Sequence, residues 1–317
     1  MVAHRNQFID DNDLSGSTSL THLMDMNDRD DDADEAHIVK HSPYYSESKF
    51  TKLLTSKAGL CILDLNIRNI HSNFDELELF INRVNICNPI SAICLNECWI
   101  GKNTSTSNIE LPHYKMFYQR GNRRGHGHCG LIMYVHEQFR CKEITIDQEN
   151  STWDYQCIEM SHHKPNSKKY IICNIYRLPG EIVDEVNTFT DEFTTFLISV
   201  KKLKHSAFIC GDYNINLLSI NSKRHYNNFF DNVVAKGFFP RITLPTRLQD
   251  QSHTLIDNIF TNNIKDSNTS ASGILINEIG HTDHKIIFTF EENMNYVEKS
   301  VKYITIERND KISVKMN

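Results

Sequence analysis

The sequence FICGDYN, at residues 208–214, is the most informative stretch of the chain. Its apolar run is cut off after Cys210 by Gly211 and Asp212, and Asn214 follows two positions later. This pattern predicts a buried β-strand whose carboxyl end presents a carboxylate and an amide to a cleft. We therefore place a candidate functional site at this strand end.

Further short apolar runs are each followed or preceded by acidic or histidine side chains. Residues 92–96 precede Glu97, residues 254–256 precede Asp257, and a polar turn carries Asp283 and His284 just before residues 286–288. Carboxylates at strand ends and one histidine are the groups that a metal-assisted hydrolase of phosphate esters needs. The acids hold a hard cation and orient a water molecule, while the histidine and the amide stabilise charge on the phosphate.

Charge is distributed unevenly along the chain. Residues 1–50 hold 11 Asp/Glu and 4 Lys/Arg, whereas the remainder holds 29 acidic and 30 basic residues. Because residues 1–56 are acidic and poor in periodic apolar positions, we predict that they form a disordered leader. We expect one domain over residues 57–292 and a C-terminal tail over residues 293–317. A near-neutral domain can still bind nucleic acid through a local basic patch.

The composition argues against several classes of protein. The nine cysteines form no CxxC pair, which argues against a zinc ribbon or thioredoxin-type chemistry. The first 20 residues contain three aspartates and no apolar segment, so we expect no signal peptide. No apolar run approaches the roughly 20 residues of a membrane span. We expect an intracellular protein, nuclear or cytoplasmic, without a membrane partner.

Short strands and amphipathic helices are predicted to alternate through the domain. Apolar runs predict strands near residues 60–67, 90–95, 130–135, 155–160, 169–176, 206–210, 254–260 and 284–290. A helix is expected to begin at Asn73, with Glu76 completing a capping box. Further helices are expected over residues 186–203 and 222–236, the second stopping at Gly237. Mixed hairpins and crossovers indicate an α/β domain with two packed sheets and helices outside.

Seven short motifs occur in a distinctive order. They are LNIR (65–68), LNECW (95–99), IYRLP (175–179), GDYN (211–214), PTR (245–247), LIDNI (255–259) and TDH (282–284). In this order the chain resembles the endonuclease/exonuclease/phosphatase superfamily, and more narrowly the apurinic-endonuclease-like domain of non-LTR (LINE-type) retrotransposons. The resemblance runs from about Ser42 to Phe290. It implies a four-layer α/β sandwich, in which two packed, mixed, mainly antiparallel β-sheets are flanked by helices.

The resemblance implies a divalent cation, Mg²⁺ or alternatively Mn²⁺. Asn66 and Glu97 would help to hold the cation, with Glu97 as the main protein ligand and Asp283 nearby. Mg²⁺ keeps several water molecules and uses only one or two carboxylates, so this sparse ligand set is sufficient. Taken alone, Asn66 could instead be a simple cap at a strand end.

Catalytic roles are also implied by the resemblance. Asp212 would orient or deprotonate the attacking water, and Asn214 would hydrogen-bond this water or a phosphate oxygen. Tyr176 would direct its hydroxyl toward the phosphate or the leaving group. The alternative for Tyr176 is a core aromatic residue whose hydroxyl bonds a carbonyl oxygen.

The final motif would supply the group that stabilises the transition state. His284 would donate a hydrogen bond to a non-bridging phosphate oxygen as charge builds there. Asp257 would accept from the other ring nitrogen and fix the tautomer and charge of His284, although a turn residue is the alternative for Asp257. Thr246 and Thr282 match positions that line and support the site.

Arginines near the motifs are candidates for contacts to phosphates on either side of the scissile bond. They are Arg68, Arg123, Arg124, Arg177 and Arg247. For Arg123 and Arg124 a solvated loop is the alternative. In the same glycine-rich stretch, His126 and His128 are interpreted as parts of a turn rather than as zinc ligands.

Three positions depart from the usual motifs of the superfamily. Cys98 stands where Thr is common, Tyr213 replaces Phe, and Thr282 replaces Ser. None of these changes removes a catalytic group. We therefore predict an enzyme, a Mg²⁺-dependent DNA endonuclease that hydrolyses a phosphodiester to a 3′-hydroxyl and a 5′-phosphate.

In the parent elements such nicking of target DNA primes reverse transcription during retrotransposition. We expect DNA as the partner, a monomeric protein, and no reverse transcriptase domain in this chain. One alternative is a phosphatase or phosphodiesterase of the same superfamily that acts on a non-DNA substrate. Another is a catalytically silent, retrotransposon-derived protein that binds nucleic acid.

Overall fold

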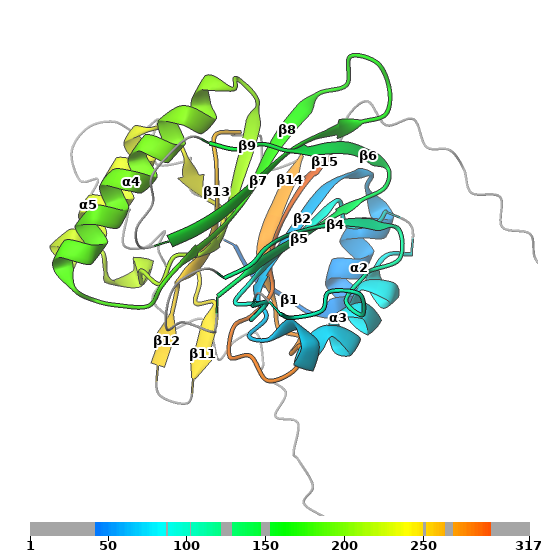
Figure 1. Ribbon diagram of the computed structural model, residues 1–317, viewed down its shortest axis with the longest axis horizontal. Coiled ribbons are helices and arrows are strands. Elements are labelled where there is room, and N and C mark those ends of the chain that lie inside the picture. Colours follow the sequence, from blue (N-terminus) through cyan, green and yellow to red (C-terminus); the bar gives the residue numbers. More distant parts are fainter. Residues whose placement is uncertain are drawn as a thin grey trace, which may run out of the picture.

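The predicted strands assemble into two β-sheets that pack face to face (Figure 1). The computed structural model describes residues 42–86, 88–101, 103–121, 129–146, 153–249, 252–263 and 269–292. The sheets have seven and six strands, and a separate two-stranded hairpin lies beside them. The expectations for residues 1–41 and 293–317 concern segments outside the described residues.

The seven-stranded sheet has the order β1-β14-β15-β2-β3-β5-β4. Its strands are β1 (Tyr44–Tyr45), β2 (Gly59–Asn66), β3 (Ala92–Asn96), β4 (Tyr114–Gln119), β5 (Leu131–His136), β14 (Ser270–Leu275) and β15 (Ile287–Glu292). The neighbours β1–β14 and β2–β3 are parallel, and all other neighbours in this sheet are antiparallel.

The six-stranded sheet has the order β10-β13-β9-β8-β7-β6. Its strands are β6 (Phe139–Glu143), β7 (Trp153–His162), β8 (Lys169–Arg177), β9 (Ser206–Asp212), β10 (Phe239–Pro240) and β13 (Asp257–Thr261). Only β8 and β9 are parallel neighbours. The hairpin consists of β11 (Arg247–Gln249) and β12 (Ser252–Thr254).

Helices cover the outer face of each sheet (Figure 1). They are α2 (Glu47–Ser56) and α3 (Ile70–Val84) on the seven-stranded sheet, with α4 (Val183–Lys202) and α5 (Arg224–Ala235) on the six-stranded sheet. A short 3₁₀ turn, η1 (Leu217–Ser219), precedes α5. The predicted four-layer α/β sandwich with mixed, mainly antiparallel sheets is confirmed. No helix in the described ranges is both long and apolar enough to cross a membrane.

The two faces of β2 belong to different cores. Leu60 and Ile62 pack in the core that includes the six-stranded sheet, whereas Cys61 and Leu63 pack with the helices α2 and α3. Because successive strand residues point to opposite faces, this alternation turns the side chain of Asn66 toward the other sheet. The register of β2 thereby delivers a polar side chain to the end of the inter-sheet space.

The folded domain begins before residue 57, the start that the composition predicted. Residues 47–56, predicted as part of the leader, form α2, and the side chains of Phe50 and Leu54 are buried against the seven-stranded sheet. The prediction was wrong here because the acidic average over the first 56 residues hid a short amphipathic helix.

The predicted cap of α3 is also wrong by one helical turn. The helix begins after Asn69, whose side chain accepts from the backbone N–H of His71 at 3.2 Å. Asn73 lies inside the helix, where its Nδ2 donates to the carbonyl oxygens of Ile67 at 2.7 Å and Arg68 at 3.2 Å. Asn73 therefore holds the loop between β2 and α3. In contrast, the predicted stop of α5 at Gly237 is confirmed, since Gly237 has φ +81°.

The burial of α2 leads to a first prediction. Replacing Phe50 by alanine removes a fully buried aromatic ring, so we expect the free energy of unfolding to fall by about 3–5 kcal/mol. Urea unfolding monitored by circular dichroism measures this loss. The exposed Lys52→Ala variant in the same helix is the matched control and should unfold like the wild type. Equal stabilities of the Phe50→Ala and Lys52→Ala variants would contradict the packing of α2 onto the domain.

Candidate active site

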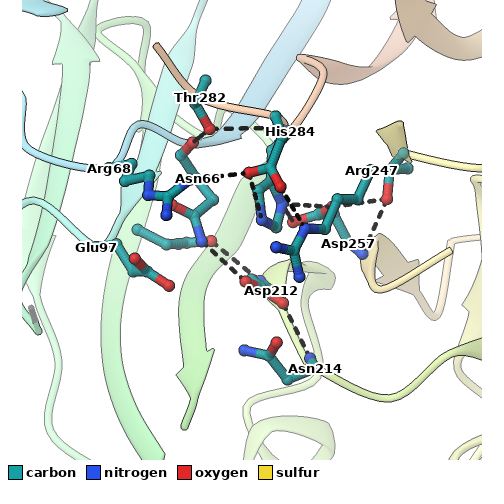
Figure 2. Close-up of polar contacts among 12 residues, drawn as sticks. Asn66, Arg68, Glu97, Asp212, Asn214, Arg247, Asp257, Thr282 and His284 are labelled. Carbon is teal, nitrogen blue, oxygen red and sulfur yellow. Dashed lines mark hydrogen bonds and ion pairs between the residues drawn. The ribbon is translucent and has the colours of Figure 1, made fainter. Parts of the chain in front are cut away.

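The functional candidates meet because of strand register. Asp212 at the end of β9 is the register partner of Asp257 on the antiparallel β13 and of Tyr176 on the parallel β8. Asn66 ends β2 on the facing sheet, and its Nδ2 donates to Asp212 Oδ2 at 2.9 Å. Figure 2 shows the side chains of Asn66, Asp212 and Asp257 converging with His284.

Asp212 is a buried carboxylate with specific hydrogen bonds. In addition to the bond from Asn66, its Oδ1 accepts from the backbone N–H of Asn214 at 2.9 Å. Burial, followed by the negative charge of Asp257, raises the pKa of Asp212 to about 7, although His284 and Asn66 act in the opposite direction. A carboxylate with a pKa near neutrality can accept a proton from water at physiological pH.

His284 and Asp257 form a buried pair. The ring Nδ1 of His284 lies 2.9 and 3.0 Å from the two carboxylate oxygens of Asp257, and Thr246 Oγ1 donates to Asp257 Oδ2 at 2.6 Å. Burial lowers the pKa of His284, but the charge and hydrogen bond of Asp257 outweigh this effect and raise the pKa to about 9. The imidazole is therefore protonated at neutral pH and can donate from Nε2.

Thr282 ties this pair to the opposite sheet. Its Oγ1 donates to the carbonyl oxygen of Asn66 at 2.8 Å and accepts from the backbone N–H of His284 at 3.2 Å. Thr246 and Thr282 thus brace Asp257, His284 and the end of β2.

Glu97 lies on the other side of the site, directly after β3. Tyr176 Oη donates to Glu97 Oε1 at 2.8 Å. Burial, followed by the charges of Glu97 and Asp212, raises the pKa of Tyr176 far above its usual value, so its hydroxyl stays protonated. These two side chains belong to a pocket of about 270 Å³, whose lining residues are Arg68, Glu97, Trp99, Cys129, Tyr176, Leu178 and Pro179.

Asn66 and Glu97 fit a hard divalent cation. Asn66 Oδ1 is buried and accepts no hydrogen bond from the described part of the chain, so this acceptor is available to a ligand. Oxygen ligands from one carboxylate and one amide suit Mg²⁺, which completes its shell with water. Ligand atoms of Asp212, Asp257 and His284 also lie within 4.8 Å of one another, but this set could hold an ion only with the imidazole deprotonated.

Asp283, expected near the cation, is bound by arginine and glutamine side chains. Its Oδ1 accepts from Arg68 at 3.3 Å, and its Oδ2 accepts from Arg247 Nε at 2.7 Å and from Gln249 Nε2 at 2.5 Å. Burial raises the pKa of Asp283, but the hydrogen bonds from Arg247 and Gln249 and the charge of His284 lower it to about 2. The carboxylate is therefore ionised at neutral pH and bound by two cationic side chains.

Arg177 is not available for DNA, in contrast to the prediction. The residue is 1% exposed. Its guanidinium donates to the carbonyl oxygens of Asn214 at 3.2 Å and Gly180 at 2.9 Å, and it lies over the ring of Phe189. Asn214 in turn donates from Nδ2 to the carbonyl oxygen of Arg177 at 2.8 Å. Arg177 therefore holds the loop that carries Asn214 in place through these hydrogen bonds.

Several site residues have a left-handed backbone. Positive φ angles occur at Arg68 (47°), Asn69 (79°), Glu97 (48°), Trp99 (54°) and Asn214 (48°). Non-glycine residues in this region carry strain, which persists only where surrounding contacts hold them. One such contact is the hydrogen bond from Asn69 N to Glu97 O at 2.9 Å, which joins the loops after β2 and β3.

Sequence reasoning missed two buried amides and Gln249. Asn96 Oδ1 accepts from the backbone N–H of Asp212 at 3.0 Å, and Asn96 Nδ2 donates to Asn174 Oδ1. The available indication was a polar residue inside an otherwise apolar strand, at both Asn96 and Asn174. The predictions for Arg123, Arg124, His126 and His128 concern positions outside the described residues.

Comparison with solved structures identifies the fold. An AP endonuclease from Leishmania major matches with TM-score 0.61 and 11% identity, covering 86% of this chain and 98% of that chain. The human Nocturnin catalytic domain matches with TM-score 0.55 and 10% identity, covering 74% and 94%. The endonuclease domain of TRAS1, a telomere-specific non-LTR retrotransposon, matches with TM-score 0.51 and 10% identity, covering 74% and 98%.

Sequence comparison adds nothing to this result. No protein-family model and no curated protein matches the chain. At these identities the structural matches show the fold alone, which is that of the endonuclease/exonuclease/phosphatase superfamily. The roles of the individual residues stay predictions.

The buried His284–Asp257 pair predicts a pH dependence of stability. Because folding raises the pKa of His284 from 6.5 to about 9, its stabilising contribution is complete below pH 6.5 and is lost as pH rises through 9. A shift of this size corresponds to about 3 kcal/mol. Asp212 also reduces the stability of the fold as pH rises from 3.8 to about 7, because folding raises its pKa as well.

Thermal unfolding in EDTA over this pH range measures the effect. The wild type should lose stability from pH 6.5 to 9, and the His284→Gln variant should show a flatter curve. His113→Gln, at an exposed histidine, is the control and should follow the wild type. Parallel curves for wild type and His284→Gln would rule out the charged pair.

Proposed function

We propose that this protein is a Mg²⁺-dependent DNA endonuclease that leaves a 3′-hydroxyl and a 5′-phosphate. One observation carries the proposal: a free buried acceptor, a carboxylate with a near-neutral pKa and a protonated imidazole meet at one end of the sandwich. They belong to Asn66, Asp212 and His284. A cation ligand, a base and a cationic donor are the groups that phosphodiester hydrolysis requires.

Each residue has a distinct task in this reaction. Asp212 takes a proton from a water molecule, whose oxygen bonds to phosphorus while the bond from phosphorus to O3′ breaks. His284 donates from Nε2 to a non-bridging oxygen, and Asp257 keeps the imidazole charged and oriented. Asn214 has its Nδ2 bound to a carbonyl oxygen, which leaves its side-chain oxygen to orient the water. The departing O3′ takes up a proton from solvent water and becomes the 3′-hydroxyl, and Asp212 releases its proton to solvent.

Glu97 and Asn66 would hold the divalent cation. When bound, Mg²⁺ or Mn²⁺ supplies charge neutralisation and polarises the phosphate oxygens. Tyr176 fixes one oxygen of Glu97 through its hydroxyl at 2.8 Å, so the carboxylate is oriented before any ligand binds. This pre-orientation reduces the reorganisation that catalysis would otherwise need.

A DNA substrate is supported by the motif order and by the structural neighbours. The neighbours include AP endonucleases and the endonuclease domain of a non-LTR retrotransposon. Arg68 and Arg247 at the mouth of the site have side chains that are 49% and 34% exposed, and can contact phosphates. On this basis we assign the chain to the nicking step of retrotransposition, in which a new 3′-hydroxyl primes reverse transcription.

A plasmid assay tests the reaction. Supercoiled DNA should be converted to the nicked form with Mg²⁺ and remain supercoiled in EDTA. The reason is that the cation held by Asn66 and Glu97 neutralises the negative charge of the phosphate. Extension of the nick by a DNA polymerase checks for the 3′-hydroxyl. Nicks that a polymerase extends only after phosphatase treatment would contradict the predicted product.

Single substitutions test the residue roles. Asp212→Asn and Glu97→Gln each remove one charge with little change of shape, and nicking should fall by roughly 10²–10³-fold. The Asp75→Asn variant, at an exposed position of α3, is the matched control and should nick like the wild type. Nicking by Asp212→Asn within tenfold of the control would exclude Asp212 as the base.

A further inference from the structure

Asp283 joins two segments that come from different sheets. Arg68 follows β2 of the seven-stranded sheet, and Arg247 lies on β11 of the hairpin (Figure 2). Both guanidinium groups bind the single carboxylate of Asp283, at 3.3 Å and 2.7 Å. We call this set Arg68–Asp283–Arg247 the arginine bridge. Asp283 Oδ1 lies 4.0 Å from His284 Nε2.

Stability does not account for the arginine bridge. The side chains of Arg68, Asp283 and Arg247 are 49%, 18% and 34% exposed. Ion pairs at such positions contribute only about 0–1 kcal/mol, because solvent screens them and two long side chains lose freedom. Gln249 nevertheless adds a third hydrogen bond to the same carboxylate, so the arrangement orients the two arginines strongly.

The arginines keep donors that point away from Asp283. Within the described part of the chain, Arg68 uses one terminal nitrogen in this bridge and Arg247 uses Nε. An arginine presents five N–H donors in a planar fork, so each guanidinium retains several. Such forks match the oxygens of a phosphodiester, and a fork already held in place loses little entropy on binding.

Backbone contacts fix the bridge relative to the catalytic histidine. Arg247 and His284 form an isolated antiparallel bridge, and Leu248 N donates to Asp283 O at 3.2 Å. Lys285 N also donates to Thr246 O at 2.8 Å. The hairpin therefore cannot shift without moving the segment that carries His284, so the fold sets the position of Arg247 relative to His284.

We propose that Asp283 is a positioning residue that holds Arg68 and Arg247 as a two-pronged clamp for backbone phosphates of the DNA, and that it is not a metal ligand. The proposal rests on the proposed function. It assigns Glu97 and Asn66 to the cation and the arginine bridge to the strand, with Arg68 and Glu97 lining the same pocket.

The direction in which DNA affinity changes when the carboxylate of Asp283 is removed distinguishes this role from its alternatives. Removing a carboxylate near a polyanion strengthens DNA binding if charge alone matters, because repulsion is lost. Loss of positioning acts in the opposite direction and weakens binding. If Asp283 were a metal ligand, its removal would not weaken binding in EDTA, and it would raise the Mg²⁺ concentration at half-maximal nicking.

The experiment compares Asp283→Asn with Glu278→Gln, which removes one exposed charge in the preceding loop. Fluorescence anisotropy with a labelled duplex in EDTA measures the Kd, and plasmid nicking measures the Mg²⁺ midpoint. We expect Asp283→Asn to raise the Kd about five- to tenfold, with an unchanged Mg²⁺ midpoint. Glu278→Gln should leave the Kd equal or slightly lower. Thermal unfolding checks that both variants are folded.

A second variant isolates the geometry of the clamp. Arg247→Lys keeps the charge but loses the fork, so it should weaken binding in the wild-type background and have little further effect on Asp283→Asn. Equal or tighter DNA binding by Asp283→Asn, additive effects in the double variant, or a tenfold higher Mg²⁺ midpoint would each overturn the proposal.

Wild-type controls separate this proposal from the function on which it rests. A wild-type protein that neither binds the duplex nor nicks plasmid DNA would refute the endonuclease function itself. A wild-type protein that nicks DNA, with Asp283→Asn behaving as a metal-ligand variant, would refute only the clamp.

Discussion

A buried chain of amides between the two sheets holds the candidate site together. Asn96 from the seven-stranded sheet donates to Asn174 of the six-stranded sheet and accepts from the backbone N–H of Asp212. Asn174 also donates to the carbonyl oxygens of Leu95 and Ile132. Leaving such a group unpaired in the core costs about 1–3 kcal/mol, so the sheets are held at one separation. The hydrogen bond between Asn66 and Asp212 depends on that separation.

The two sheets contribute different chemistry to the site. Asn66 at the end of β2 and Glu97 directly after β3 offer oxygen acceptors from one sheet, whereas Asp212 and Asp257 come from adjacent strands of the other. Burial, followed by the negative charge of Asp257, raises the pKa of Asp212, while the protonated His284 and the hydrogen bond from Asn66 act in the opposite direction. The acidic pair and its histidine therefore form one electrostatic unit.

Local strain and long-range support occur at the same positions. Arg68, Glu97 and Asn214 all have positive φ angles, and each is held by a residue from elsewhere in the chain. Asn73 of α3 binds the carbonyl oxygen of Arg68, and Arg177 binds that of Asn214. Strain concentrated in this way keeps the side chains in orientations that relaxed loops would not maintain.

The local sequence pattern sufficed to place the long strands and helices, and to put Asp212, Glu97 and Asp257 beside strand ends. This was possible because apolar periodicity and helix-ending glycines depend on neighbouring residues only. Short elements such as α2 and the β11–β12 hairpin were missed. They contain few apolar residues, and the burial of these residues becomes evident only when the rest of the domain packs on them. The burial of Arg177 and the ion pairs of Asp283 were decided by the tertiary structure alone. Their partners are brought close by packing, and no local pattern encodes which of two nearby charges will meet.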